Sequence, residues 1–368
     1  MRNLQTFFGV VAATKPRARI DAFRVCAVCA SIAGGWFLFA CAPARAQSSA
    51  ATTWTVSIVL PPRLVAGEPA TLAVLGVDGR LADGITVDVG GGQRVKTDKS
   101  GRAFFTAPTD MTVLIVSAAG NSAAVLIDAP TTGMGEQAAI VAPVVSQVDR
   151  FSVCGGGFRG DVDANRVSIN GDRAFVLAAS PECIVVLASP RALPGPAKLL
   201  IETPVGQWTA TTTLASLHFD PPLPPLVPEK RSKLALHVQG TDQALRVWVE
   251  NQTPGVLRFL RGDRQEVLTS GGSQNSAEIE VQAIATGDFF FQGRILAAPD
   301  AGLARRYLSA AESIAPKDAQ HAVKNLVERL THHPDETEKV WRDAEAILST
   351  TMAGDFRTLI ECAAAALQ

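Results

Sequence analysis

The chain has 368 residues, of which 47% are hydrophobic and 19% are charged, and its formal net charge is −1. This balance lacks the concentrated basic surface that nucleic-acid binding requires, so nucleic acid is excluded as a partner. The length allows about two to four domains of ordinary size.

The first 46 residues are predicted to be a secretory signal peptide. Basic residues precede the uncharged residues 25–40, and Ala44 and Ala46 present the small side chains that signal peptidase accepts. The uncharged run is shorter than the ~20 residues of a membrane span, although a retained signal anchor stays an alternative. A second alternative is lipoprotein processing at residues 38–41, which would leave Cys41 as an acylated first residue.

Cleavage after Ala46 would leave 322 residues with a net charge of −6 and no membrane span. The location predicted for the mature chain is the periplasm, the cell surface or the extracellular space. Of its three cysteines, Cys154 and Cys183 lie in one predicted domain, and an oxidising compartment favours a disulfide between them. Cys362 lies in a predicted helix and is expected to be free.

Residues 52–128 are predicted to form a β-sandwich. Short stretches rich in β-branched residues alternate there with turns, such as the glycines at 90–92. The segment also resembles bacterial immunoglobulin-like modules, in which a T-D-x-x-G-x-A turn precedes a late strand. Here that turn is Thr97, Asp98, Gly101 and Ala103.

Residues 138–216 are predicted to form a second β-sandwich, with a hairpin turn at Asn170-Gly171. The order "VCGGGF", "VSING", "AFVLAASP", "IVV" and "PGPAKLLI" is similar to an IPT/TIG domain. That immunoglobulin-like fold is shared by plexins, Rel-type transcription factors and many bacterial surface proteins. The resemblance implies a spacer or binding module without a catalytic residue, and Cys154 and Cys183 depart from its usual pattern.

The proline-rich residues 220–230 are predicted to be an extended, semi-rigid linker. A third β-sandwich is predicted at 231–298, where Ile279 and Val281 alternate with Glu278 and Glu280.

From residue 301 to 368 the apolar residues recur at helical spacing in four stripes, which predicts a small helical segment. Pro316 is expected in a first turn, Asp335 as a cap, and Gly354 between the last two helices. We expect these helices to form a bundle or a layer against the third sandwich.

The glycine-rich stretch at 151–169 raises two hypotheses of ligand binding. A phosphate loop is not supported, because neither the Gly-Lys-Ser/Thr sequence nor a following helix is present. Calcium is suggested by oxygen side chains at positions 1, 3, 5 and 12 of a loop like that of the EF-hand, namely Asp161, Asp163, Asn165 and Asp172. Position 6 is Arg166 where the sharp turn requires glycine, so a polar loop between strands is the favoured interpretation.

Other short motifs have ordinary explanations. The Arg-Gly-Asp tripeptide at 261–263, which integrins recognise, falls where a hairpin turn is expected. His332 and His333 fit a solvated helix end better than a metal site. The remaining histidines are expected to stand alone in separate elements, at His218, His237 and His321. Three tryptophans are interpreted as core or rim residues and not as carbohydrate platforms, at Trp54, Trp208 and Trp248.

The predicted fold class is mainly β, with tandem immunoglobulin-like β-sandwiches followed by a small C-terminal helical segment. The predicted function is a non-catalytic structural or binding protein of the cell envelope or extracellular space. It is expected to need no cofactor or metal and to bind a protein or envelope partner. The alternative is an accessory subunit or enzyme with a site between the third sandwich and the helices. A polar cleft there would favour that alternative, and a packed apolar seam would favour the structural role.

Overall fold

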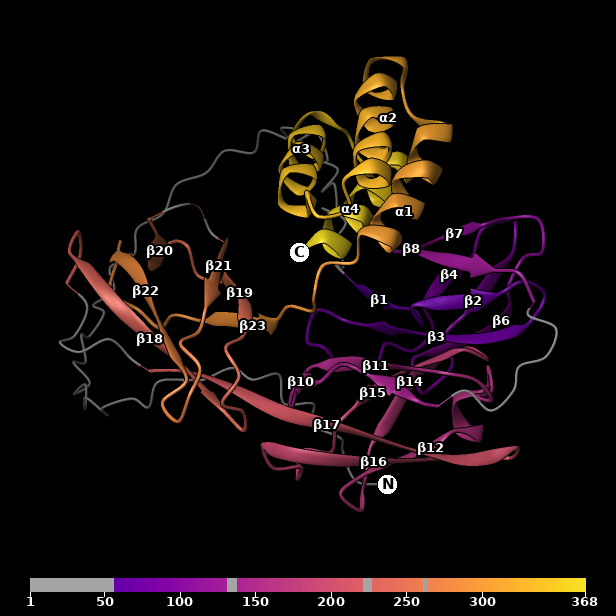
Figure 1. The fold of residues 1–368 in the computed structure, drawn as a ribbon, viewed down its shortest axis with the longest axis horizontal. Helices are drawn as coiled ribbons and strands as arrows, with labels where there is room; N and C mark the ends of the chain where they lie inside the picture. The colour runs from indigo at the N-terminus through magenta and orange to yellow at the C-terminus, as the bar shows by residue number, and fades with distance from the viewer. Residues whose placement is uncertain (1–55, 131–137, 221–226, 261, 263) are drawn as a thin grey trace, which may run out of the picture.

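The fold is given by a computed structural model that describes residues 56–130, 138–220, 227–260, 262 and 264–368. The predicted signal peptide at 1–46, Cys41 and the linker residues 221–226 lie outside the described residues. Within these ranges the chain forms three β-sandwiches and then four helices (Figure 1). This confirms the predicted fold class of tandem immunoglobulin-like sandwiches with a helical segment.

The first sandwich packs a three-stranded sheet on a five-stranded sheet. Alternation directs one face of each strand inward, as in β6 (Arg102–Thr106), where Ala103 and Phe105 are buried and Phe104 is exposed. The first sheet contains β1 (Ser57–Val59), β3 (Pro69–Leu75) and β6 (Arg102–Thr106). The second contains, in spatial order, β2 (Arg63–Val65), β8 (Asn121–Asp128), β7 (Val113–Ala118), β4 (Thr86–Asp88) and β5 (Arg94–Lys96).

The second sandwich contains the predicted hairpin. Asn170 and Gly171 both have positive φ, 51° and 89°, and they join β12 (Arg166–Ile169) to β13 (Asp172–Arg173), which confirms the turn. One sheet contains β14 (Phe175–Ala179), β15 (Cys183–Leu187), β11 (Arg150–Cys154) and β9 (Ile140–Val141). The other contains β13 (Asp172–Arg173), β12 (Arg166–Ile169), β16 (Gly195–Thr203), β17 (Gly206–Phe219) and β10 (Val144–Ser146).

The first two sandwiches are packed against each other without a spacer. Thr71 of β3 pairs with Ala179 of β14, so one sheet path runs through both sandwiches. An apolar cluster between them includes Ala73 and Leu177, which are at most 5% exposed. The Thr71 hydroxyl also donates a hydrogen bond of 2.5 Å to the carbonyl of Gly160.

Gly160 has no room for a side chain at this contact. A Cβ atom there would lie 1.9 Å from the carbonyl oxygen of Pro69. The two sandwiches therefore approach at backbone distance, and their relative position is fixed by close packing.

The third sandwich shares a strand with the second. Residues 206–214 of β17 pair with β16, and residues 216–219 pair with β18. The predicted alternation on β22 is confirmed, because Ile279 and Val281 are buried and Glu278 and Glu280 are exposed. One sheet contains the end of β17 with β18 (Arg231–Gln239), β22 (Ser276–Ala283) and β20 (Leu257–Phe259). The other contains β21 (Arg264–Leu268), β19 (Arg246–Asn251) and β23 (Phe291–Ile295).

The helices have the bounds α1 (Ala301–Ile314), α2 (Lys317–His332), α3 (Thr337–Thr350) and α4 (Asp355–Leu367). Gly354 precedes α4, as the sequence predicts, whereas Pro316 is the residue before α2 and lies just outside the first turn in which it was expected. The prediction of Asp335 as a cap is wrong, because Glu336 precedes α3 and makes no capping hydrogen bond through its side chain.

The helices pack on one another and cover the first sandwich. Of the two predicted arrangements, a bundle or a layer against the third sandwich, the second is wrong. Leu126 of β8 lies in the same buried cluster as Leu308 of α1 and Ile360 of α4. The Tyr307 hydroxyl donates to the carbonyl of Ala124 at 3.3 Å. The reason lies in β7 and β8, whose outward faces carry the apolar residues Val113, Ile115, Ala124 and Leu126. Their inward residues lie in the sandwich core, so both faces require cover.

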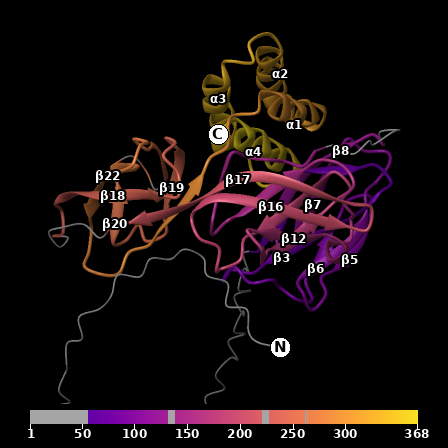
Figure 2. The same cartoon turned by 60° about the horizontal axis from the view of Figure 1, so that its bottom comes forward.

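The result is a layered body with one lateral sandwich. In Figure 1 the layers run from the helices through β7 and β8 to β3 and then to the sheets of the second sandwich. Figures 1 and 2 both show the third sandwich to one side, joined through β17. The chain therefore turns back after β23, and its helices reach the first sandwich again.

Candidate functional site

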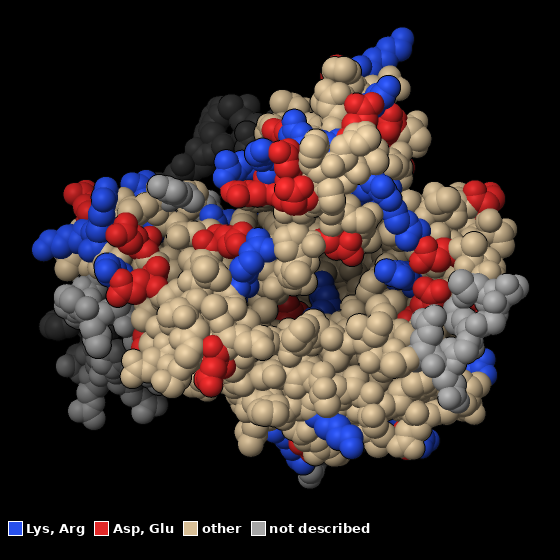
Figure 3. All heavy atoms as spheres, in the orientation of Figure 1, with Lys and Arg blue, Asp and Glu red and all other residues tan. Residues whose placement is uncertain are grey.

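A polar groove lies between the third sandwich and the helices. Its cavity has a volume of about 790 Å³, and one wall is the outer face of the sheet formed by β19, β21 and β23. The other wall comes from α3 and α4. In Figure 3, acidic and basic side chains gather where the helices meet the third sandwich.

Strand alternation directs the residues of the sheet wall into the groove. On β19, Val247 and Val249 are fully buried in the sandwich core, so Trp248 and Glu250 point the other way. Trp248 is therefore not a core residue, so of the core and rim positions that the sequence interpretation allowed, the core is wrong. The register places Arg294 opposite Trp248, and both Gln292 and Arg264 opposite Glu250.

The helical wall is built from residues spaced three or four apart, which share one face of a helix. Trp341, Glu345 and Leu348 of α3 and Arg357, Glu361 and Ala364 of α4 line the groove. Trp341 is half-buried, and its ring N–H has no hydrogen-bond partner among the described residues. The sequence interpretation overlooked Trp341, although it occupies the same helix face as the predicted apolar stripe residues Ala344 and Leu348.

Most carboxylates of the groove are neutralised by arginines. Arg264 contacts Glu250 at 3.0 Å, and Arg357 contacts Glu361 at 2.7 Å. Arg357 also donates to the carbonyls of Leu348 and Thr351, at 2.9 and 2.7 Å. The groove thus presents planar hydrogen-bonding groups of both charges around two tryptophans, and it is not a packed apolar seam.

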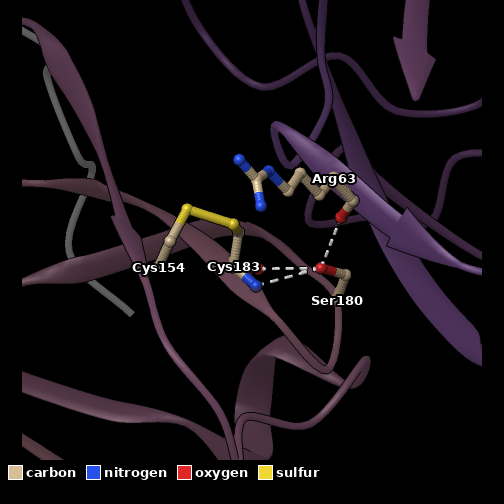
Figure 4. The surroundings of a disulfide bond; sticks show 4 residues. All are labelled: Arg63, Cys154, Ser180 and Cys183. Atoms are coloured by element: carbon tan, nitrogen blue, oxygen red, sulfur yellow. Dashed lines mark hydrogen bonds between the residues drawn. A yellow bond between two sulfur atoms is a disulfide. The ribbon is translucent and has the colours of Figure 1, made fainter. Parts of the chain in front are cut away.

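A disulfide joins Cys154 and Cys183, as the sequence predicts (Figure 4). The two residues lie directly opposite each other on β11 and β15. The amide of Gly155 bonds to the carbonyl of Glu182 beside them, so the cysteines occupy a non-hydrogen-bonded pair, where side chains are closest. The Ser180 hydroxyl donates to the carbonyl of Arg63 at 2.7 Å and accepts from the Cys183 amide at 3.1 Å.

Charged side chains from three parts of the fold meet near this disulfide. Arg306 of α1 contacts Asp128 of β8 at 2.6 Å. Burial raises the pKa of Glu182, and the charge of Asp128 adds to this, while Arg63 and Arg306 oppose it. The contact between Arg306 and Asp128 joins the helices to the first sandwich, Glu182 of the second sandwich lies within range of these charges, and the cluster lies outside the groove.

The residues suggested to bind calcium make other hydrogen bonds and ion contacts in the structure. The Asn165 side chain is 4% exposed, accepts from the Arg159 amide and donates to the carbonyls of Arg159 and Asp161. Asp161 accepts from the Asp163 amide, and Asp163 contacts Arg102 at 3.4 Å. Asp172 lies on the exposed strand β13. Among the described residues, no group of three or more His, Cys, Asp and Glu side chains is arranged to hold a metal ion.

Two histidines that were expected to stand alone in separate elements lie next to each other in the structure. His218 of β17 lies directly opposite His237 of β18, and their Nε2 atoms contact the two oxygens of Asp220 at 3.1 and 3.0 Å. Predicting this contact needed the register between the strands, which no local pattern supplies. His332 ends α2 and His333 follows it, in line with a helix end.

The remaining candidates do not define a site. Arg261 and Asp263 of the tripeptide, and Trp54, lie outside the described residues. Trp208 contacts Phe158 edge to face at 6.0 Å, at the rim of the second sandwich. Across the parts of the chain that the structure describes, none of the helices has the length and apolar character needed to cross a membrane.

Comparison with known proteins gives a likeness in fold only. No family model and no curated protein matches the chain. Among solved structures, a Bacteroides ovatus glucan-utilisation protein, SGBP-B, in complex with a mixed-linkage heptasaccharide is 12% identical, with a TM-score of 0.24. The match covers 64% of this chain and 73% of that chain.

Two further matches are tandem immunoglobulin structures. The I9–I11 tandem of titin is 9% identical over 66% of this chain and 95% of that chain, with a TM-score of 0.20. The N-terminal four domains of Dscam1 isoform 6.9 are 12% identical over 64% and 73%, with a TM-score of 0.21. At such TM-scores, the architecture rests on the strand order of this chain itself, which is that of paired sheets in three sandwiches.

Proposed function

We propose that this protein is a non-catalytic binding protein of the cell envelope or extracellular space, and that the groove is its ligand-binding surface. The observation that carries the proposal is the groove, which two rigid elements line with two tryptophans and paired charges. Ligand sites are commonly found at such interfaces between domains, with volumes of ~300–1,000 Å³.

Export is supported by two independent features. The first 46 residues have the basic, apolar and small-residue order of a signal peptide. The disulfide between Cys154 and Cys183 is of the kind that persists in oxidising compartments. Within this proposal the first sandwich is a bacterial immunoglobulin-like module, the second is an IPT/TIG module, and Cys41 is the anchor if the lipoprotein route is used.

The polar character of the groove is also what the alternative function, an accessory subunit or enzyme, requires. Binding without catalysis is favoured because Glu250 and Glu361 are each held by an arginine. A general acid or base must reach a substrate proton with its own oxygen atoms, whereas an oxygen of each of these two carboxylates already contacts an arginine.

Export is tested by fractionating cells that express the full chain. We expect the protein in the envelope or the medium, shortened by about the length of the predicted signal. A Cys41→Ser variant separates the routes, because it removes a lipid anchor and leaves ordinary signal cleavage intact. Full-length protein in the cytoplasm would contradict the proposal.

Binding by the groove is tested with immobilised mature protein and envelope extract. We expect material to be retained by the wild type and lost from the variants Trp248→Ala and Glu345→Ala. Trp208→Ala is the matched control, since Trp208 is half-buried on β17 outside the groove. Equal retention by the wild type and both groove variants would overturn the proposed site.

A further inference from the structure

We propose that the ligand of the groove is a carbohydrate, specifically a neutral oligosaccharide. This inference rests on the proposed function and deepens it by naming the class of ligand. It draws on the two tryptophans, the balance of charge and the dimensions of the groove.

The tryptophans provide aromatic faces on both walls. Trp248 projects from the sheet and Trp341 from α3, and both are half-buried, so their rings are held while part of each surface stays available. Indole rings carry a negative face and a large apolar area. The C–H groups of a sugar ring are weakly positive and form a flat apolar surface, which stacks on such a face.

The polar residues favour a neutral ligand over an ionic one. Glu250 is paired with Arg264 and Glu361 with Arg357, so these charges cancel and leave little net field to attract an ion of either sign. Of the other charged groups, Arg342 contacts Glu338, and Glu345 and Arg294 carry opposite charges. Sugar hydroxyls both donate and accept, so they satisfy carboxylates and guanidinium groups side by side. Vicinal hydroxyls also match the paired atoms of these planar side chains, and of Gln292.

The size of the groove fits a short chain of sugars. Its volume of about 790 Å³ lies in the upper part of the range for ligand sites, ~300–1,000 Å³. A single small ion or monosaccharide would leave most of this space to water, whereas several linked rings can contact both walls.

The test uses the mature protein and a panel of neutral hexose and N-acetylhexosamine oligosaccharides of two to six units, with anionic counterparts. Binding is followed by titration calorimetry and by tryptophan fluorescence. We expect a neutral oligosaccharide to bind and to change the fluorescence. Trp248→Ala and Trp341→Ala should each weaken binding at least about tenfold, as truncation of a central aromatic residue does.

Two controls separate stacking from loss of fold. Trp208→Ala should bind like the wild type, and Trp248→Phe should retain part of the affinity because a ring remains. Far-ultraviolet circular dichroism of each variant reports whether the sandwiches are intact.

The possible outcomes discriminate between this inference and the proposed function. A panel without a binder, together with groove-dependent retention of a protein from envelope extract, overturns the carbohydrate and leaves the proposed function standing. Binding only of anionic oligosaccharides overturns the argument from charge. A blank panel with no groove-dependent retention overturns both.

Discussion

Reduction of the disulfide between Cys154 and Cys183 should measurably lower the free energy of unfolding. The bridge links residues 29 apart in sequence, and a closed loop of this size stabilises a fold by roughly 3 to 4 kcal/mol in the chain-entropy description. We therefore expect a reducing agent to lower the melting temperature of the mature chain by several degrees. Calorimetry measures this, and a double Cys→Ser variant should show no further response to the reductant. Identical curves for the oxidised and reduced wild type would contradict the role of the bridge.

Glu182 gives a pH dependence with a defined sign. Its pKa in the fold is raised above the unfolded value of 4.5, chiefly by burial. The stabilisation linked to the protonated form is thus complete below pH 4.5 and is lost as the pH rises through the folded value. Glu182→Gln, which stays neutral, should raise the free energy of unfolding at pH 7. The gain is small, below about 1 kcal/mol, because solvent screens the partly exposed group.

Denaturant titration of Glu182→Gln at several pH values measures this effect. The difference from the wild type should grow between pH 4 and pH 7 and should be absent at the acid end. Glu202→Gln, at an exposed position of β16, is the control. If the difference in the free energy of unfolding between Glu182→Gln and the wild type were largest at acid pH, the inferred direction of the pKa change would be wrong.

At the residue scale, local patterns predicted some features and missed those that depend on contacts distant in sequence. The Asn170-Gly171 turn and the disulfide were predictable, because their signals are a dipeptide and a cysteine pair within one domain. Trp248 could have been assigned to the outer face, since Val247 and Val249 flank it on a strand. The contact between His218 and His237 could not, because it depends on which strands pair.

At the element scale, the apolar outer face of β8 is covered by α1 and α4. Leu308 of α1 is fully buried in the cluster between the helices and β8. Leu308→Ala should therefore cost about 2–5 kcal/mol of stability, through lost burial and a cavity. Leu193→Ala, at a site 78% exposed, should change stability by less than about 0.5 kcal/mol. Denaturant unfolding followed by circular dichroism measures both.

Cys362 reports on the same interface. Its thiol points at the carbonyl of Ala124 on β8, and burial raises its pKa, so it should react slowly with thiol reagents while the helices are docked. In Leu308→Ala the reaction should be faster. Rapid labelling of the wild type would contradict the docking of α4 on β8.

The helical stripes were predictable from spacing, but their partner was not. Periodicity identifies an apolar face without saying which surface covers it. The available signal lay in "TVLIVSA" at residues 112–118, which is apolar on both faces of a strand and so requires cover on both sides. Proximity in sequence favoured the third sandwich, and complementarity of apolar faces selected the first.

At the scale of the whole molecule, the chain doubles back and does not extend as a string of modules. The helices return to the first sandwich, and the second sandwich packs on its other side. Small-angle scattering of the mature chain should therefore give a radius of gyration near that of a compact body, about 20 Å for its length. Three sandwiches in a line would give a clearly larger radius of gyration and a longer maximum dimension. That result would contradict the packing of the helices and the second sandwich on the first.

The strand β17 limits how the second and third sandwiches can be separated from each other. Its first nine residues complete one sandwich and its last four complete the next, with only Ala215 between them. A cut at Ala215 would place the new chain ends inside two sheets and not in a loop, because the residues on either side of it are paired with β16 and with β18. Neither sandwich keeps its full set of strands unless the boundary falls at this one residue, and force applied to either sandwich is transmitted to its neighbour along one continuous strand.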